Sequence, residues 1–250
     1  MIIKLKKFVK LSNGRNKGGT IIFRRRGSIK KQIYRFVDFK MFLSRFLPYI
    51  VFDISYDPFR NSYLMLVYYI NGIYSYRVFI DGVKLGTFFS FFSFYYSYKG
   101  STCMLKDAPL GKDVCLVSST FSKSIFSRSA GAFCFVLKLD YRFKLALLKL
   151  TSGVKYLVSF YNYCAVGKIN NSFYNNLYFG KAGKKRNLGY KQLVRGIARN
   201  PVDHPNGGRT PGGKVYRSFS FNIARSFKKT GNKKFSNIFA CKSYIKKLLI

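Results

Sequence analysis

The sequence predicts an all-β protein in which two small barrels are flanked by extended basic segments. Three observations indicate this fold class. Short runs rich in β-branched and aromatic residues recur along most of the chain, with turn signals between them. Hydrophobic residues make up 48% of the 250 positions, so a core can be buried. Both ends are rich in glycine and basic residues and lack a long amphipathic pattern.

The first predicted barrel contains five candidate strands, at residues 20–26, 33–39, 49–55, 63–70 and 73–80. Turn signals follow three of these runs, at Asp57-Pro58, Asn71-Gly72 and Asp81-Gly82. Five strands in roughly 70 residues are typical of a small closed barrel. An OB-type barrel and an SH3-like barrel both fit this pattern.

A connection of low complexity follows at residues 83–100, built largely from Phe, Tyr and Ser. Its aromatic residues could form a stripe that stacks on bases, or a poorly specified strand and linker.

The second predicted barrel has candidate strands at residues 113–119, 132–140, 144–150 and 154–160. Ser152-Gly153 marks a hairpin turn between the last two. The run at 144–150 is also compatible with one or two helical turns, but the Ser-Gly turn favours a hairpin.

The formal net charge is +38, from 46 Lys and Arg against 8 acidic residues, all of them Asp. Local ion pairs cannot neutralise this excess, so a polyanion must supply most of the counter-charge. Nucleic acid and an anionic membrane are the two candidates. The longest run without charge, Asn61 to Tyr76, contains Asn71-Gly72 and is shorter than a membrane-spanning helix. We therefore expect a nucleic-acid partner and no membrane.

Motifs of known enzyme classes are missing from the sequence. There is no P-loop, no Rossmann glycine pattern and no glutamate. The lone histidine, His204, directly follows Asp203, and neighbouring side chains in an extended loop tend to point apart. The five cysteines form no CxxC pair, and Cys134 and Cys164 lie in apolar runs typical of buried small side chains. We expect no enzyme activity, cofactor, metal site or small-molecule substrate.

Basic residues alternate with glycine in several places, as in RRRG at 24–27, GKAGKK at 180–185 and GGRTPGGK at 207–214. Arginine can grip a phosphate with two donors, and lysine supplies a point charge. Glycine lets the backbone amide approach a phosphate directly. These clusters predict close packing of the chain on RNA.

Several stretches of the chain resemble the universal L-two family of large-subunit ribosomal proteins, and its mitochondrial members in particular. They are GRNKGGTIIFRRRG with IYRFVDFK, SYDPFRN, DAPLG, RSAG, GKAG and VRGIARNPVDHPNGG, in the family's order. The string NPVDHP, at residues 200–205, is the most specific of them.

This resemblance implies an OB-like RNA-binding domain followed by an SH3-like barrel, with tails that extend into ribosomal RNA. Together with the strand pattern it gives four segments. These are a basic N-terminal extension at 1–19, the OB-like domain at 20–97, the SH3-like barrel at 98–190 and a basic C-terminal tail at 191–250.

The function implied by the resemblance is that of a structural constituent of the large ribosomal subunit. Such a protein binds large-subunit rRNA, contacts neighbouring ribosomal proteins and helps the small subunit to associate through an intersubunit bridge. Structural Mg²⁺ would belong to the rRNA. The family's loop near the peptidyl-transferase centre corresponds here to Asn200, Pro201, Val202, Asp203, His204, Pro205, Gly207 and Gly208.

Two departures from the family pattern concern this loop. Asn206 stands where the family usually has a second histidine, and the sequence Arg209-Thr210-Pro211-Gly212 lacks the family's acidic residue. Both departures weaken any mechanism that needs a second histidine or a nearby carboxylate, and neither affects packing on RNA.

The charge pattern and the resemblance together predict a set of RNA-contacting residues. They are Arg15, Arg24, Arg25, Arg26, Lys30, Lys31, Arg35, Arg60, Arg128, Lys181, Lys184, Lys185, Arg186, Arg195, Arg199, Asn200, His204, Arg209 and Lys214.

Two alternatives to a purely structural role stay open: His204 takes part directly in peptidyl transfer, or the protein is a free single-stranded RNA-binding protein. The N-terminus is not typical of a secretory signal, and residues with AT-rich codons dominate. We expect a ribosomal protein of the mitochondrion, encoded in the organelle, with a plastid as the alternative.

Overall fold

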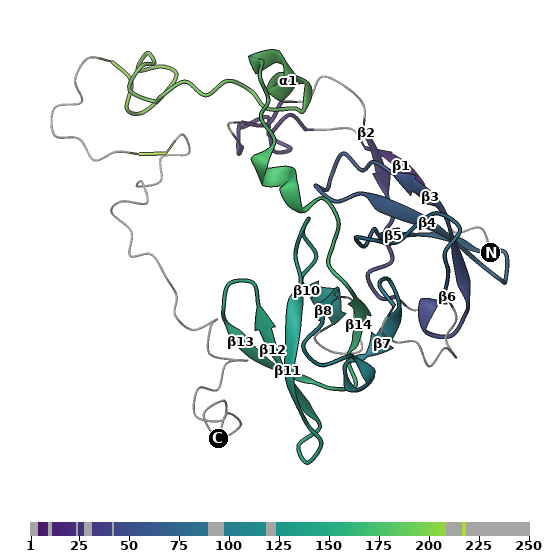
Figure 1. The fold of residues 1–250 in the computed structure, drawn as a ribbon. Coiled ribbons are helices and arrows are strands. Elements are labelled where there is room, and N and C mark those ends of the chain that lie inside the picture. Colours follow the sequence, from purple (N-terminus) through teal and green to yellow (C-terminus); the bar gives the residue numbers. More distant parts are fainter. Residues whose placement is uncertain are drawn as a thin grey trace. The chain divides into compact units, whose positions relative to one another are not determined.

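The computed structural model describes residues 5–9, 12–23, 25–27, 32–41, 43–89, 98–118, 124–208 and 217–218. Regular structure among these residues is nearly all β (Figure 1). The exceptions are the helix α1 (Ala182–Asn187) and 3-10 turns at Leu43–Arg45, Leu105–Asp107 and Ser172–Asn176. The predicted all-β fold class is confirmed. None of the helices in this described part is long and apolar enough to cross a membrane.

The chain divides into two compact units. The first is built from Ile33–Leu177 with the described residues that precede Val9. The second joins Val9–Gln32 to the chain that begins at Tyr178. Strands β1 (Lys6–Val9) and β2 (Gln32–Arg35) pair where the chain leaves and re-enters the first unit. Both barrels therefore belong to the first unit.

The first barrel contains a four-stranded antiparallel sheet in the order β5-β4-β3-β6. Its strands are β3 (Tyr49–Ser55), β4 (Leu64–Tyr69), β5 (Tyr74–Val78) and β6 (Phe88–Phe89). Val37, which follows β2, forms a parallel bridge to Tyr76. The strands predicted at 49–55, 63–70 and 73–80 are confirmed. Gly72 adopts the left-handed conformation that the hairpin between β4 and β5 requires.

The strand predicted at residues 20–26 is wrong. The described residues of this run form only isolated bridges, from Ile21 to Arg15 and from Arg26 to Tyr190. The carbonyl of Gly14 accepts hydrogen bonds from the amides of Ile22 and Phe23, at 2.8 and 3.0 Å, and this folds the segment back on itself. The run therefore belongs to the second unit and not to the first barrel.

The second barrel contains a six-stranded sheet in the order β13-β12-β11-β8-β14-β7. In chain order these are β7 (Thr102–Met104), β8 (Asp113–Cys115), β11 (Cys134–Asp140), β12 (Leu145–Leu150), β13 (Lys155–Ser159) and β14 (Tyr163–Val166). The strands predicted at 132–140, 144–150 and 154–160 are confirmed, and the helical alternative for 144–150 is wrong.

The strand predicted at 113–119 is interrupted at Leu116, whose φ is +54°. This conformation is costly for a branched residue and ends β8 one residue before β9 (Val117–Ser118) begins. Strand β9 then pairs with β10 (Ser124–Phe126) in a separate two-stranded sheet. Strands β7, β10 and β14 were not predicted from the sequence.

The two barrels share a core. One cluster of buried side chains combines Met65 and Val67 of the first barrel with Cys115, Ala165 and Ile169 of the second. A further cluster lies within the second barrel and includes Val136, Leu148 and Val158. The first unit is therefore held together by apolar packing across the boundary between its barrels.

Arg77 of β5 adds a polar connection within this packing. The side chain is fully buried, and its guanidinium donates to the hydroxyl of Tyr49 and, at 2.7 Å, to the hydroxyl of Thr102. It also lies 4.9 Å from the centre of the Tyr49 ring. The Tyr49 hydroxyl donates in turn to the carbonyl of Gly100 at 3.3 Å. Because Thr102 begins β7, this network fastens the first barrel to the second.

The cysteines within the described residues behave as buried apolar side chains. Cys103, Cys115, Cys134 and Cys164 are all buried and unpaired by disulfides. Removal from water raises the pKa of the Cys134 thiol to about 11, so it stays protonated and unreactive at neutral pH. The prediction that Cys134 and Cys164 are buried is confirmed, and Cys241 lies outside the described residues.

Candidate RNA-binding surface

Two basic segments that are far apart in the sequence meet in the second unit. The Gly27 amide donates to the carbonyl of Gly189 at 2.9 Å, and the Lys191 amide donates to the carbonyl of Arg25 at 2.8 Å. Between these two hydrogen bonds, Arg26 and Tyr190 form an antiparallel bridge. A short β-like pairing therefore joins the arginine run of the N-terminal part to the segment that follows α1.

This pairing gathers cations from both parts of the chain. The guanidinium of Arg26 lies 5.3 Å from the centre of the Tyr190 ring, a cation–π contact that holds the side chain over the junction. Helix α1, immediately before the junction, carries Lys184, Lys185 and Arg186 in its last turn. Cations at a helix C-terminus are favoured by the helix dipole, so these charges also stabilise the helix itself.

The charge of this surface has almost no counterpart inside the unit. Asp203 is the only acidic residue among the described residues of the second unit. Most predicted RNA contacts of the unit are exposed, namely Arg15, Arg25, Arg26, Lys181, Lys184, Lys185, Arg186, Arg195 and Asn200, while Arg199 is half-buried. Exposed like charges that are held this close repel one another, and a polyanion relieves that repulsion.

Arg15 lies in a tight hairpin at the start of the unit. Its guanidinium donates to the carbonyl of Gly19 at 2.8 Å, and the amide of Thr20 donates to the Asn16 side chain at 2.9 Å. The sequence GRNKGG is thus a preformed turn. It also presents Lys17, an exposed cation that the sequence reasoning did not select.

The loop from Arg195 to Gly208 is closed by its own backbone. The carbonyl of Asn200 accepts from the amides of Asp203 and His204, at 3.0 and 3.2 Å. The Gly208 amide donates to the carbonyl of Arg199 at 3.0 Å, which joins the two ends of the loop. A Cβ at Gly207 would collide with the carbonyl oxygen of Asn200, so only glycine fits there.

His204 points into this loop. Its side chain is only 3% exposed, in contrast to Val202 at the tip, which is 97% exposed. The imidazole packs on Gly196 so closely that a Cβ at that position would lie 2.6 Å from Cε1 and 2.9 Å from Nε2. Within the described residues, His204 is the packed centre of the loop and Val202 is its outermost side chain.

The hydrogen bonding of His204 also bears on the catalytic alternative. Its Nδ1 accepts a hydrogen bond from the backbone amide of Asn206 at 3.0 Å. In a catalytic triad this nitrogen carries a proton and donates it to a carboxylate. Because Nδ1 of His204 accepts a hydrogen bond, it does not carry the proton that a triad histidine donates to its carboxylate. The neighbouring Asp203 is exposed.

Asn206, which replaces the second histidine of the family pattern, has its own role in the unit. Its side-chain oxygen accepts from the Arg217 amide at 3.0 Å, and its side-chain nitrogen donates to the Arg217 carbonyl at 3.3 Å. The side-chain amide thus bonds both backbone groups of Arg217, as a paired strand would, and holds Arg217 beside the loop. Sequence reasoning noted the departure but could not assign this contact.

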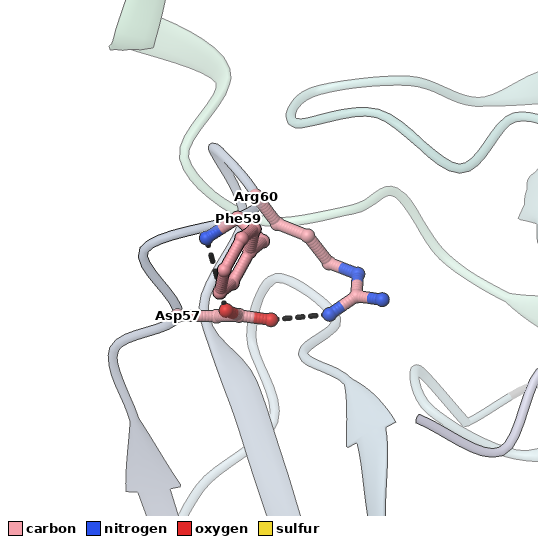
Figure 2. Close-up of polar contacts among 3 residues, drawn as sticks. All are labelled: Asp57, Phe59 and Arg60. Carbon is pink, nitrogen blue, oxygen red and sulfur yellow. Dashed lines mark hydrogen bonds and ion pairs between the residues drawn. The ribbon is translucent and has the colours of Figure 1, made fainter. Parts of the chain in front are cut away.

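The predicted contacts of the first unit have partners inside it. Arg60 pairs with Asp57, which is fully buried and also accepts from the amide of Phe59 at 3.0 Å (Figure 2). The guanidinium groups of Arg60 and Arg128 lie 5.4 and 5.5 Å from the centre of the Phe39 ring.

Arg35 lies 5.8 Å from the centre of the Tyr76 ring. Arg35 and Arg60 are partly buried, whereas Arg128 is exposed.

Five predicted contacts fall outside the described residues: Arg24, Lys30, Lys31, Arg209 and Lys214. Besides Lys17, sequence reasoning missed Lys191 and Arg217, whose positions depend on pairings with remote segments. Within the described part of the chain, no three His, Cys, Asp or Glu side chains gather as they would around a metal ion.

Comparison with known proteins adds the family. The profile of the ribosomal proteins L2, RNA-binding N-terminal domain, matches residues 3–90, and that of the ribosomal proteins L2, C-terminal domain, matches residues 98–225. The large ribosomal subunit protein uL2 of Amoebophilus asiaticus (strain 5a2) is 35% identical over 201 residues, which cover 80% of this chain and 72% of that protein. The large ribosomal subunit protein uL2c of Angiopteris evecta is 39% identical over 196 residues, 78% and 70% of the two chains. The chain belongs to the ribosomal protein L2 family.

Proposed function

We propose that this protein is a structural constituent of the large ribosomal subunit of an organelle and binds the large-subunit rRNA. The observation that carries this proposal is the pairing of residues 25–27 with 189–191, which gathers basic residues from two remote segments in a unit with a single described aspartate. Membership in the L2 family supports it, since both relatives described above are named as large ribosomal subunit proteins.

The mechanism of binding is electrostatic and steric. Each Lys or Arg that neutralises a phosphate releases condensed counterions, so affinity falls steeply with salt. The backbone is already ordered by the pairing of Gly27 with Gly189 and by the closure of the loop at 195–208. Binding to RNA therefore costs little further conformational entropy in these segments. RNA helices are recognised largely by such shape complementarity.

A charge-removal experiment tests this mechanism. Four substitutions, Arg25→Gln, Arg26→Gln, Lys184→Gln and Lys185→Gln, are made singly and together. The affinity of each variant for large-subunit rRNA is compared with that of the wild type over a range of salt concentrations. Each phosphate interaction that a substitution removes lowers the slope of log K against log [salt] by about 0.7 to 0.9. Arg25→Lys and Lys184→Arg keep the charge and serve as matched controls with an unchanged slope. A combined Gln variant with the wild-type slope would refute this surface.

Residues beyond the junction extend the same proposal. We propose an OB-like domain at 20–97 and an SH3-like barrel at 98–190, of which residues 20–32 and 178–190 belong to the second compact unit. The segments at 1–19 and 191–250 extend into rRNA. We include among the contacts the five residues outside the described part, as well as Arg35, Arg60 and Arg128. For Arg60 the pairing with Asp57 means that RNA contact is made by a guanidinium already held in place.

The loop at 200–208 lies near the peptidyl-transferase centre in this proposal and supports that region as a prefolded wedge. The protein also contacts neighbouring ribosomal proteins and assists subunit association through a bridge to the small subunit. The burial of His204 favours a structural role over participation in peptidyl transfer. His204→Gln in reconstituted subunits separates the two: slow peptide-bond formation in fully assembled particles supports catalysis, and an assembly defect with normal chemistry contradicts it.

The organelle is proposed to be the mitochondrion, with a plastid as the alternative. The abundance of residues with AT-rich codons supports an organelle genome, and the similarity to the uL2c protein of Angiopteris evecta keeps the plastid alternative open. The remaining alternative, a free single-stranded RNA-binding protein, predicts a soluble chain that is well ordered throughout without rRNA. Sedimentation of the endogenous protein with large subunits at high salt would exclude it.

A further inference from the structure

The outer face of the first barrel carries a continuous row of exposed aromatic and aliphatic side chains. Cross-strand pairing places Phe88 opposite Ile50, Ile50 opposite Tyr68, and Tyr68 opposite Tyr74, so the row crosses all four strands of the sheet. The Tyr68 and Tyr74 rings are 4.8 Å apart between centroids, and the ring of Phe52 lies 5.8 Å from that of Tyr74. We call Ile50, Phe52, Tyr68, Tyr74 and Phe88 the aromatic face.

The local structure explains why this face is exposed. Strand β3 alternates between the buried Tyr49 and Val51 and the exposed Ile50 and Phe52. A register shift between Val51 and Asp53 makes Phe52 the extra residue of a bulge, and Phe52 is 63% exposed. Phe88 in the edge strand β6 is 59% exposed. Contiguous apolar surface of this kind marks an interaction site more often than isolated exposed residues do.

The same face lacks the charge that characterises the rest of the protein. From Phe46 to Tyr76 the chain has one basic residue, Arg60, against two acidic residues, Asp53 and Asp57, although the whole chain carries +38. Arg60 is already paired with Asp57. Within strands β3 to β6 the single cation is Arg77, which is fully buried.

The second barrel provides a comparison within the same chain. Its strands β11 and β12 present exposed lysines, Lys138 and Lys149, on the surface. Single-stranded RNA platforms combine stacking rings with a positively charged groove that follows the phosphates. The aromatic face has the rings without the cations, so it is poorly suited to a polyanion and well suited to an apolar protein surface.

We infer that the aromatic face is the docking site for another protein of the assembled subunit. The partner presents aliphatic or aromatic side chains to the row and carries a basic residue opposite Asp53, which is exposed at the edge of the bulge. This interaction goes beyond rRNA binding, for which most of the proposed contacts lie in the second unit. It rests on the proposed function only in that the partner is sought within the large subunit.

A site-specific cross-link tests the inference. A photo-crosslinking phenylalanine analogue at position 52 is introduced into the full chain, which is then incorporated into large subunits and irradiated. We expect a cross-link to a different polypeptide, at a peptide with apolar side chains. Cross-linking to rRNA, to residues 90–97 of the same chain, or to nothing would each overturn the inference.

The same analogue at position 143 is the control. Phe143 is also exposed, but it lies in the turn between β11 and β12, between Arg142 and Lys144. There we expect cross-linking to rRNA, which shows that the analogue can report RNA when RNA is present.

A pair of substitutions gives an independent measurement. Phe52→Lys with Tyr74→Lys places two cations on a face that we expect to be covered by apolar protein. Occupancy of the cross-linked partner should fall roughly tenfold or more, as for the loss of interface hot spots, and quantitative mass spectrometry of purified subunits measures it.

Co-sedimentation of the variant with rRNA is measured in the same samples. Release of the partner while the chain stays in the particle supports the inference, whereas release of the chain itself from the particle reports on the proposed function instead. If the face bound RNA, the two lysines would retain or strengthen binding and alanines would weaken it. A partner retained at full occupancy would refute docking.

Discussion

Gly196→Ala tests whether the loop at 195–208 is held by the contact between Gly196 and His204. The added Cβ would lie 2.6, 2.8 and 2.9 Å from three atoms of the imidazole. Ordinary contacts are near 3.5 to 4.0 Å, so the ring must move by about 1 Å. It cannot do so freely, because it is buried and its Nδ1 accepts the Asn206 amide at 3.0 Å.

The magnitude follows from these contacts. Overpacking of a well-packed site costs about 1 to 3 kcal/mol, and loss of the hydrogen bond to Nδ1 adds about 1 kcal/mol. The closed loop should therefore be destabilised by about 2 to 4 kcal/mol. If rRNA binds only the closed loop, the apparent Kd equals the intrinsic Kd divided by the fraction of chains whose loop is closed, so a variant loop that lies about 2 kcal/mol on the open side shows roughly a thirtyfold rise in Kd.

Gly183→Ala is the matched control for this prediction. Gly183 lies in α1 with nothing within 4 Å of an added Cβ, and alanine is the better helix former. The assay is Kd for large-subunit rRNA at fixed salt, together with hydrogen exchange of the Gly207 and Gly208 amides. His204→Asn combined with Gly196→Ala should recover part of the loss, because it removes the clash. Wild-type affinity and wild-type protection of both amides in Gly196→Ala would refute the reasoning.

Three further predictions address other parts of the molecule. Arg77→Lys keeps the charge, but a lysine cannot reach both hydroxyls of Tyr49 and Thr102, so the free energy of unfolding should fall by about 2 to 3 kcal/mol and lower the denaturation midpoint. Arg142→Lys at an exposed site is the control, and equal midpoints for the two variants would contradict the network. Burial raises the pKa of Cys134 to about 11, so unfolded chains lose this proton first. The Cys134 contribution to stability should therefore be constant below about pH 8.5 and fall by about 1.4 kcal/mol per pH unit up to about pH 11, beside similar losses from the buried thiols of Cys115 and Cys164, whose pKa values are also raised. Cys134→Ala should reduce the slope by that amount, and an unchanged slope would exclude Cys134 as one of its sources. Asn206→Ala removes both contacts to the Arg217 backbone and should speed exchange of the Arg217 amide by about tenfold or more, while Asn206→Asp keeps the acceptor and should have a smaller effect; equal exchange in all three proteins would show that the amide is protected by something else.

The sequence predicted the elements whose stability is local. The run at 49–55 alternates and coincides with β3, and Asn71-Gly72 and Ser152-Gly153 mark hairpins because their glycines reach positive φ at no cost. Strand β12 was predictable for the same reason, since its neighbour in the sheet is its neighbour in the chain. Periodicity and turn chemistry carry enough information where pairing partners are adjacent.

The elements that sequence reasoning missed depend on remote partners. Strand β14 is short, and it is ordered by β7 and β8 on its two sides. The run at 20–26 has the composition of a strand, yet the one long-range bridge of its described residues is from Arg26 to Tyr190. Leu116 adopts a positive φ that leucine disfavours by itself, so only the surrounding structure can impose it. No local pattern reports such contacts.

The candidate surface divides in the same way. Net charge and the glycine-interleaved clusters were enough to predict RNA-binding segments, because electrostatic binding depends on composition more than on arrangement. The meeting of Arg25 and Arg26 with the segment after α1 could not be predicted, nor could the internal partners of Arg60 and Arg128. Lys191 was missed because it is placed by its backbone hydrogen bond to Arg25.

The loop NPVDHP shows how a specific string can arise without chemistry on a substrate. Gly196 makes room for the imidazole of His204, Asn200 accepts the two amides that turn the chain, and Gly207 avoids the Asn200 carbonyl. The two glycines are thus required by other residues of the same loop, and Asn200 contributes through its backbone carbonyl. The side chains that face outward are instead Pro201, Val202 and Asp203. Contact with the surroundings therefore falls to a stiff, largely apolar tip, and the histidine that suggests catalysis is the residue that shapes it.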